Sequence, residues 1–188
     1  MRKYLAYDTE TGSLAPTNGS LLTVTFRVLD AQLQELETLE LTTKPEDEVY
    51  LVKASALNVN KIDLVKHNET AITYGEARGK LLNFLNRHSD AGTNKLTPIG
   101  FVVSHDDGFV QTHLVTQKEW EAHVSHRKLD VASVVEFLKF CMIIPSSIGG
   151  LEKTAKFFGV HEEGAHNATV DVNMTLNVLK AAKRRICS

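Results

Sequence analysis

The sequence predicts an α/β domain in which helices flank a mixed sheet, built as an antiparallel meander of three strands plus parallel strands. Three apolar-rich segments with the composition of strands follow one another at residues 2–10, 20–29 and 33–43. Beyond residue 54, helical spacing of apolar residues alternates with one short apolar run at residues 98–103. Because no repeat or linker interrupts the 188 residues, we expect a single domain spanning residues 1–188.

The first half of the chain supplies the meander and two helical segments. A turn at residues 30–32, Asp-Ala-Gln, joins the second and third strands as a hairpin. Residues 54–57 favour a short helical turn. Apolar side chains at helical spacing then predict an amphipathic helix over residues 73–88, and they are Tyr74, Ala77, Leu81, Phe84 and Leu85.

The second half alternates a strand with helices. Residues 98–103 form a continuous apolar run, which is typical of a strand buried on both faces. A helix is expected to begin near Asp106, with Phe109, Val110 and Leu114 on one side. Further helices are expected over residues 130–142, 151–158 and 167–185.

Composition and charge exclude several classes of protein. With 21 basic and 23 acidic residues, the chain is not basic enough to coat long nucleic acid, although an enzyme that brings its own cations could still grip a few phosphates. The longest uncharged apolar stretch, residues 140–151, is too short to span a membrane. The first residues show no signal region, and Cys141 and Cys187 have no metal or redox spacing, so we expect a cytoplasmic protein.

Asp8 and Glu10 form the first candidate site. Side chains alternate faces along a strand, so these carboxylates, about 7 Å apart, point to the same side. Their repulsion is costly unless a cation lies between them, and Mg²⁺ prefers such oxygen ligands. Two solvated acids at an exposed strand end are the alternative interpretation.

Asp171 is a second acid in an informative position. It shares a helical face with Met174, Thr175 and Val178, the stripe expected to pack on the sheet, where an acid without a partner is rare. Asn167 is a candidate N-cap, which places Asp171 at the first turn of the helix. His166 lies just before that cap, where a loop histidine more often has no function.

Asp106 and Asp107 follow the buried strand, where ligands collect in α/β sheets. Either acid could cap the next helix, and helical spacing does not decide which of the two faces a site.

Taken together, these segments resemble the DEDDh family of 3′→5′ exonucleases, the DnaQ-like branch of the ribonuclease H-like superfamily. Residues 8–12, Asp-Thr-Glu-Thr-Gly, resemble its first motif, Asp-x-Glu-Thr-x-Gly, with the glycine one position earlier. Residues 106–110 resemble its second, Asp-x-x-Phe-Leu, which selects Asp106 over Asp107. Residues 166–171, with Thr175, resemble the third, His-x-Ala-x-x-Asp-x-x-x-Thr. The resemblance implies a ribonuclease H-like mixed sheet.

Other segments extend the resemblance, and two depart from it. Residues 56–62 are similar to the family's substrate-proximal helix, and residues 129–131 and 151–160 to its supporting helices. Where the family often has Gly-His-Asn, residues 100–102 are Gly-Phe-Val, and His105 stands where Phe is common before the second acid.

The resemblance implies a metal-dependent 3′→5′ exonuclease that releases nucleoside 5′-monophosphates from single-stranded or frayed 3′ ends of DNA or RNA. Asp8, Glu10, Asp106 and Asp171 would hold two Mg²⁺ (or Mn²⁺) ions, and His166 would be the general base. The 3′-terminal nucleotide would lie against three further residues, namely Thr11, Asn60 and His105.

Two other functions stay open at this point. One is a catalytically inactive nucleic-acid-binding or assembly module of the same fold, although all four acids and His166 are present. The other is a zinc hydrolase built on His123 and His126, in a charged segment expected to be helical with no third ligand nearby. We expect a free-standing enzyme, while a homodimer and association with a polymerase both remain open.

Overall fold

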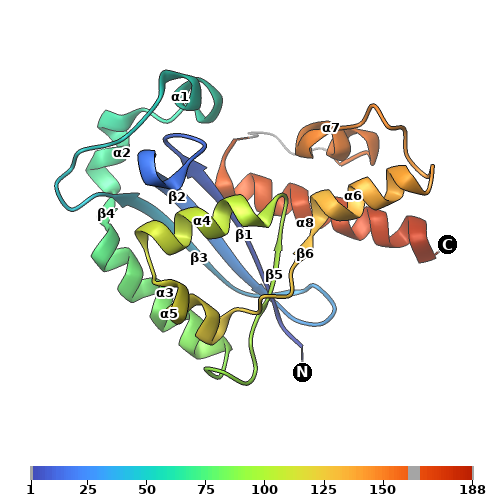
Figure 1. Cartoon of the computed structure of the whole chain (residues 1–188), viewed down its shortest axis with the longest axis horizontal. Helices are drawn as coiled ribbons and strands as arrows, with labels where there is room; N and C mark the ends of the chain where they lie inside the picture. Colours follow the sequence, from blue (N-terminus) through green and yellow to red (C-terminus); the bar gives the residue numbers. More distant parts are fainter. Residues whose placement is uncertain (1, 161–165, 188) are drawn as a thin grey trace.

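The computed structural model describes residues 2–160 and 166–187 and is organised around a six-stranded sheet with the order β4-β3-β2-β1-β5-β6 (Figure 1). The antiparallel meander occupies its centre, with β1 next to β2 and β2 next to β3. Its strands are β1 (Tyr4–Thr11), β2 (Leu21–Leu29) and β3 (Glu35–Lys44). The meander predicted from the sequence is therefore confirmed.

Three shorter strands pair in parallel with the meander or with each other. β5 (Thr97–Gly100) pairs with β1, and β6 (Leu129–Asp130) pairs with β5. β4 (Ile72–Thr73) pairs with β3 at the other edge. The sheet is thus mixed, as the sequence predicted, and β1 lies between an antiparallel and a parallel neighbour.

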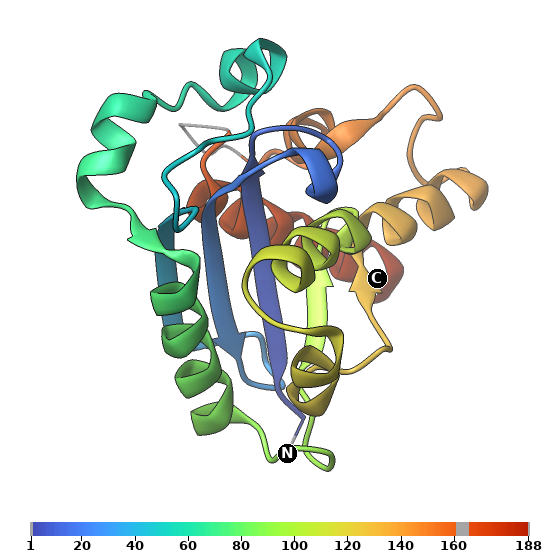
Figure 2. The ribbon, with the colours of Figure 1, turned by 60° about the vertical axis from the view of Figure 1, so that its left-hand side comes forward.

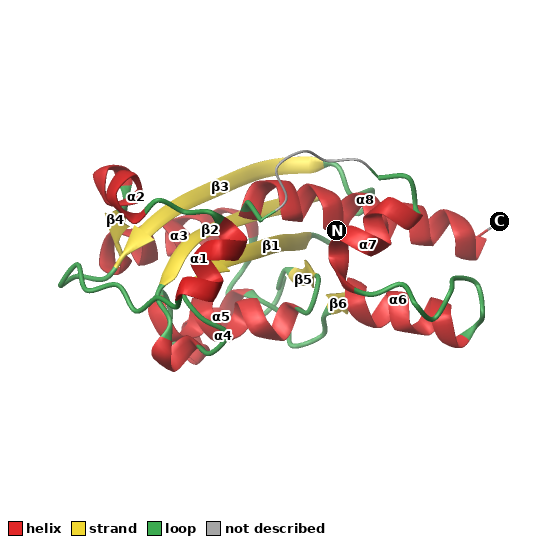
Figure 3. Cartoon of the chain, turned by 90° about the horizontal axis from the view of Figure 1, so that it is seen from above, coloured by secondary structure: helices red, strands yellow, loops and turns green. Residues whose placement is uncertain are grey.

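Helices cover both faces of the sheet (Figures 2 and 3). On one face lie α3 (Tyr74–His88), α4 (Val103–His113) and α5 (Gln117–His123). On the other lie α6 (Val131–Phe140), α7 (Gly150–Phe157) and α8 (Ala168–Cys187). The rim carries η1 (Pro16–Asn18), α1 (Ala54–Asn60) and α2 (Leu64–Thr70).

β1 divides the apolar core into two parts. Leu5 and Tyr7 pack into the part formed with α3, α4 and α5, whereas Ala6 packs into the part formed with α6, α7 and α8. This alternation continues as far as Glu10, after which the pairing register with β2 shifts. It directs Asp8 and Glu10 towards α8, and it directs Thr9 towards α4.

The strand expected over residues 98–103 ends earlier, and the helix after it begins at Val103 rather than near Asp106. The chain turns tightly here, because a Cβ on Gly100 would meet Val103 Cγ2 at 2.8 Å. Val102 makes the turn with a left-handed backbone, φ 65°, and its N–H donates to Asp130 Oδ1 at 3.0 Å. Asp106 consequently lies inside the first turn of α4 and does not start it.

Other boundaries also differ from the sequence prediction. Residues 129–131 were predicted as a supporting helix, but Leu129–Asp130 form β6 and Asp130 caps α6. α6 ends at Phe140 instead of residue 142, and Met142 follows with φ 57°. The sequence analysis missed α2 and α5, although Asp63 and Thr116 supply their side-chain caps.

Within residues 2–160 and 166–187, no helix has both the length and the apolar character needed to cross a membrane.

Val102 generates a stability prediction. A β-branched residue in the left-handed region is strained by about 1–2 kcal/mol, whereas Asn tolerates this conformation better. Val102→Asn should therefore raise the free energy of unfolding by about 1 kcal/mol in denaturant titration. Val49 is the matched control, because it is an exposed valine with ordinary φ. Val49→Asn should change stability by less than about 0.5 kcal/mol, and equal effects of the two substitutions would contradict strain at Val102.

Candidate active site

Three carboxylates meet at the carboxyl end of β1. Asp8 and Glu10 project from the same face of the strand, and Asp171 projects from the first turn of α8. Each of the three offers an oxygen atom, and these oxygens all lie within 4.8 Å of one another. The structure therefore brings together the acids that strand alternation and helix capping predicted separately.

Local hydrogen bonds position Asp171. The side chain of Asn167 accepts the backbone N–H groups of Thr169 at 3.0 Å and Val170 at 3.4 Å, which is the geometry of an N-cap. The Thr169 hydroxyl lies 2.8 Å from that of Thr25 on β2. The start of α8 is thus fixed both to its own cap and to the sheet.

The structure separates the two acids of α4 that helical spacing left open. Asp106 is 3% exposed, and its Oδ1 accepts the backbone N–H of Thr9 at 3.1 Å and the Thr9 hydroxyl at 2.7 Å. Asp107 instead accepts the Tyr7 hydroxyl and forms an ion pair with Lys128. Asp106 is therefore the acid that contacts the end of β1 beside Asp8 and Glu10, while Asp107 is fully engaged elsewhere.

A cavity of about 450 Å³ opens over these groups. Of the predicted site residues, all but one line this cavity, namely Asp8, Glu10, Thr11, Asn60, His105, His166 and Asp171. The exception is Asp106, which is buried and does not line it. Leu14, Lys53 and Val59 also line the cavity and were missed by the sequence analysis. Leu14 is 88% exposed. A bulky apolar residue in a polar loop just after Gly12 could have indicated from the sequence that Leu14 belongs to a binding site.

The candidate nucleotide-binding residues differ in how firmly they are held. The Asn60 side chain donates to the Thr11 backbone carbonyl at 3.3 Å and accepts the N–H of Ile62 at 3.1 Å. His105 is half-buried with its ring centroid 5.0 Å from that of Phe109, and burial lowers its pKa. Asn60 therefore ties α1 to β1, and His105 presents a neutral aromatic surface to the cavity.

His166 approaches the carboxylates from the loop before α8. Its Nε2 lies 3.0 Å from Glu152 Oε1 on α7, and its side chain is 43% exposed. The residue has a left-handed backbone, φ 67°, which histidine adopts more readily than most residues. Its backbone amide and its charge both act to lower the pKa of Asp171. Glu152, which orients the ring, had no signal in the sequence.

The close approach of the acids raises their pKa values. Burial, followed by repulsion from Asp171 and Asp106, raises the pKa of Glu10 from 4.5 to about 8. Burial and then the charges of the other three acids raise the pKa of Asp8 well above its usual range. Burial also raises the pKa of Asp106, although the hydrogen bonds from Thr9 act to lower it. Burial likewise raises the pKa of Asp171, although His166 acts to lower it.

The donor set fits divalent cations that prefer oxygen. Among the ion pairs in the described part of the chain, none involves Asp8, Glu10 or Asp171. A cation at this position would offset the repulsion that raises their pKa values. Three oxygen donors with Asp106 beside them are the chemistry that Mg²⁺ and Mn²⁺ prefer.

The alternative zinc site is wrong. His123 is buried, and its Nδ1 lies 2.8 Å from the Ser89 hydroxyl. α5 ends at His123, so His126 falls outside the helix and does not share a face with it. Over residues 2–160 and 166–187, neither histidine belongs to a group of potential metal ligands.

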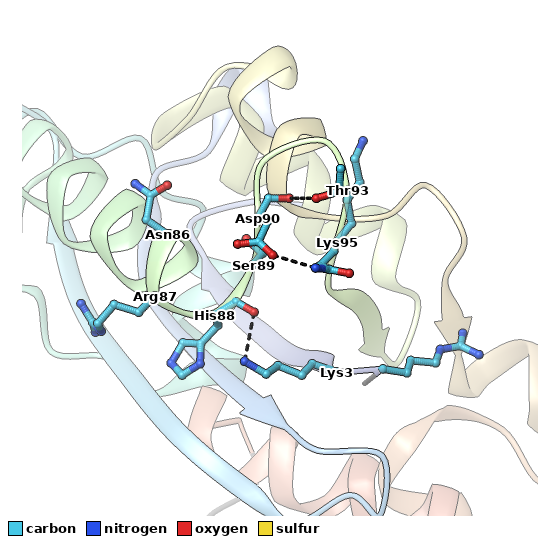
Figure 4. Close-up of a pocket in the computed structure, with 10 residues that line it drawn as sticks. Lys3, Asn86, Arg87, His88, Ser89, Asp90, Thr93 and Lys95 are labelled. Atoms are coloured by element: carbon cyan, nitrogen blue, oxygen red, sulfur yellow. Dashed lines mark hydrogen bonds between the residues drawn. The ribbon is translucent and has the colours of Figure 1, made fainter.

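A second cavity, of about 510 Å³, opens beside the beginnings of β1 and β5 (Figure 4). Asp90 is the one carboxylate among its lining residues, and it accepts the side-chain amide of Asn94 at 2.7 Å. Lys3 donates to the backbone carbonyl of His88 at 3.3 Å, and the His88 ring pairs with Glu37. These groups are bonded to each other and offer no cluster of oxygen ligands.

Comparison with known proteins identifies the fold. No protein-family model matches the sequence, and no curated protein matches it. Exonuclease I from Methylocaldum szegediense superposes with a TM-score of 0.78 at 19% identity, over 98% of this chain and 41% of that one. E. coli exonuclease I in complex with a dT13 oligonucleotide superposes with a TM-score of 0.74 at 17% identity, over 100% of this chain and 43% of that one. The fold is ribonuclease H-like.

A zinc-bound form of the E. coli exonuclease I complex with single-stranded DNA is similar too, with a TM-score of 0.76 at 18% identity, over 98% of this chain and 41% of that one. This chain therefore spans less than half the length of the exonuclease I chains. The mixed sheet with flanking helices, which the sequence predicted, is the part that they share.

The raised pKa values predict how stability depends on pH. Between 4.5 and about 8, the folded protein holds protons on Glu10 that the unfolded chain releases, and the other acids act in the same direction. The free energy of unfolding of the metal-free protein should therefore fall, by about 2 kcal/mol or more, as pH rises from about 5 to 8.

Thermal unfolding in chelator checks this sign. Mn²⁺ at about 100 times its Kd should restore about 2.7 kcal/mol at pH 8, and Glu10→Gln should flatten the pH dependence. A metal-free Tm that rises between pH 5 and pH 8 would contradict the repulsion described here.

Proposed function

We propose that this chain is a metal-dependent 3′→5′ exonuclease that hydrolyses phosphodiester bonds at single-stranded or frayed 3′ ends. The proposal rests on one observation: carboxylate oxygens of Asp8, Glu10 and Asp171 lie within 4.8 Å of one another, in a cavity that His166 also lines. The fold shared with exonuclease I structures that hold DNA oligonucleotides supports it. The products are nucleoside 5′-monophosphates.

In this proposal, the carboxylates hold two Mg²⁺ or Mn²⁺ ions, with Asp8, Glu10 and Asp171 as direct ligands and Asp106 beside them. When bound, such ions polarise the scissile phosphate and lower the pKa of water. His166 accepts the proton of the attacking water, with Glu152 orienting its ring. The chain otherwise contributes the orientation of these groups.

The cavity lining suggests how the 3′-terminal nucleotide is held. Thr11 and Asn60 supply polar groups at one wall, and His105 supplies an aromatic surface for the base. The ions offset the negative charge of a chain whose net charge is −2, so that it can bind a polyanion. A non-catalytic module of the same fold would not need four acids and His166 together.

Three broader proposals accompany this function. The chain acts as one domain over residues 1–188, with no partner required for the acids to meet. Its two cysteines, Cys141 and Cys187, are free and exposed, which suits the reducing cytoplasm. Either DNA or RNA can supply the 3′ end.

A degradation assay with 5′-labelled and 3′-labelled oligonucleotides tests the proposed function. With Mg²⁺ or Mn²⁺, 5′-labelled strands should shorten stepwise, and the 3′ label should leave first as a mononucleotide. Excess chelator or Asp8→Asn should abolish both signals. Asp90→Asn, in the other cavity, should leave the rate within about twofold. Full activity in chelator, or shortening from the 5′ end, would overturn the proposal.

A second experiment tests the role of His166. Because a general base contributes roughly 10²–10⁴-fold, His166→Ala should lower the single-turnover rate by about that factor. Its Mn²⁺ affinity should stay close to that of the parent in calorimetry, in contrast to Asp8→Asn. A rate within a few-fold of the parent would remove the base assignment, and a matching loss of Mn²⁺ affinity would make His166 a ligand.

A further inference from the structure

The face of β1 opposite the carboxylates holds the two consecutive acids of α4. Thr9 donates both its backbone N–H, at 3.1 Å, and its hydroxyl, at 2.7 Å, to Oδ1 of Asp106. Two residues earlier on the same face, the Tyr7 hydroxyl donates to Asp107, which also pairs with Lys128. The Thr9 and Tyr7 contacts are buried and the Lys128 pair is partly exposed, and the first two join the end of β1 to the beginning of α4.

We propose that the Thr9 hydroxyl is the positioning group for Asp106, and that it holds this carboxylate beside the Asp8–Glu10–Asp171 cluster in the geometry that cation binding requires. The inference about catalysis rests on the proposed function, whereas the inference about cation binding does not.

Repulsion explains why Asp106 needs such a group. Asp106 lies close enough to Asp8 and Glu10 for its charge to raise the pKa of both, so keeping it there opposes electrostatic repulsion when these groups are ionised. Both Thr9 donors go to the same oxygen, which fixes the plane of the carboxylate and leaves the second oxygen unengaged by Thr9. Groups that orient a metal ligand in this way typically change metal affinity or activity 10–100-fold when removed.

The hydroxyl is not required by the sheet itself. At position 9 a valine would have the same β-branched shape and equally good strand propensity, and it would retain the backbone N–H donor. Thr9 is 8% exposed, so either side chain would be almost wholly buried at this position. The single feature that threonine adds over valine is the 2.7 Å hydrogen bond to Asp106.

Tyr7 and Asp107 keep α4 in place when Thr9 is changed. The Tyr7–Asp107–Lys128 contacts hold α4 against β1 independently of Thr9. Tyr7 is 1% exposed and packs against Phe26 and Trp120, with ring centroids at 5.8 and 5.6 Å. Removing the Thr9 hydroxyl should therefore release the Asp106 side chain without moving the helix.

The experiment compares Thr9→Val with Thr9→Ser, which keeps the hydroxyl. Calorimetric Mn²⁺ affinity should fall about 10–100-fold in Thr9→Val and return to within about threefold in Thr9→Ser. On a single-stranded oligonucleotide, kcat should fall with Mn²⁺ affinity while KM stays unchanged. Should Thr9→Val not fold, Thr9→Ala against Thr9→Ser makes the same comparison.

Thr43→Val is the matched control. Thr43 is a fully buried threonine of β3, and its hydroxyl donates to the backbone carbonyls of Leu21 at 2.8 Å and Leu22 at 3.2 Å. Losing this hydroxyl should lower the Tm but leave Mn²⁺ affinity and kcat unchanged. If Thr9→Val likewise lowers only the Tm and leaves Mn²⁺ affinity and kcat unchanged, the positioning role is wrong.

The two readouts separate this inference from the proposed function. If the parent degrades no oligonucleotide, yet Thr9→Val binds Mn²⁺ more weakly and Thr9→Ser does not, the positioning role stands and the nuclease proposal fails. If the parent is a 3′→5′ exonuclease and Thr9→Val equals it in both Mn²⁺ affinity and kcat, the nuclease proposal stands and the positioning role is wrong.

Discussion

Repulsion among buried carboxylates is the constraint on which the rest of this structure depends. Asp8, Glu10 and Asp171 lie within 4.8 Å of one another, with Asp106 close enough to raise two of their pKa values. Such an arrangement persists only where the surrounding backbone is held by many other contacts. β1 meets this need, because it is a central strand paired on both edges and packed on both faces.

Three elements, β1, α4 and α8, carry the four acids, which helps the cluster to survive its own repulsion. Strand alternation directs Asp8 and Glu10 to one face, the Asn167 cap fixes the turn that carries Asp171, and Thr9 restrains Asp106. Moving the backbone of Asp8, Glu10 or Asp171 would disturb a strand or a helix cap, and moving the Asp106 side chain would break a buried hydrogen bond. The free energy of forming the two apolar cores therefore offsets the electrostatic cost, and a bound cation would reduce that cost.

The sequence predicts a site residue where local sequence alone determines its position, and fails where tertiary contacts determine it. Strand alternation placed Asp8 and Glu10 on one face because a period of two is a local property, and the Asn167 cap placed Asp171 at the first turn of its helix. Helical spacing could not separate Asp106 from Asp107, and only the resemblance to the second motif selected Asp106, since the start of α4 depends on how Gly100 packs on Val103 and on the bond from Val102 to Asp130. α2 and α5, seven residues each, were missed because helices this short depend on tertiary contacts.

The segment before Asp106 shows how the fold compensates for an unusual sequence. Residues 100–102 are Gly-Phe-Val where the resembled family often has Gly-His-Asn, and Val102 occupies a strained left-handed conformation there. Val102 itself offers no side-chain cap to α4, although its backbone N–H is fixed to Asp130. β1 adds further restraint, because Tyr7 and Thr9 bind the two α4 acids from the face opposite Asp8 and Glu10. One strand thus presents two carboxylates on one side and holds a third acid from the other, so the geometry of the site follows from the alternation of β1.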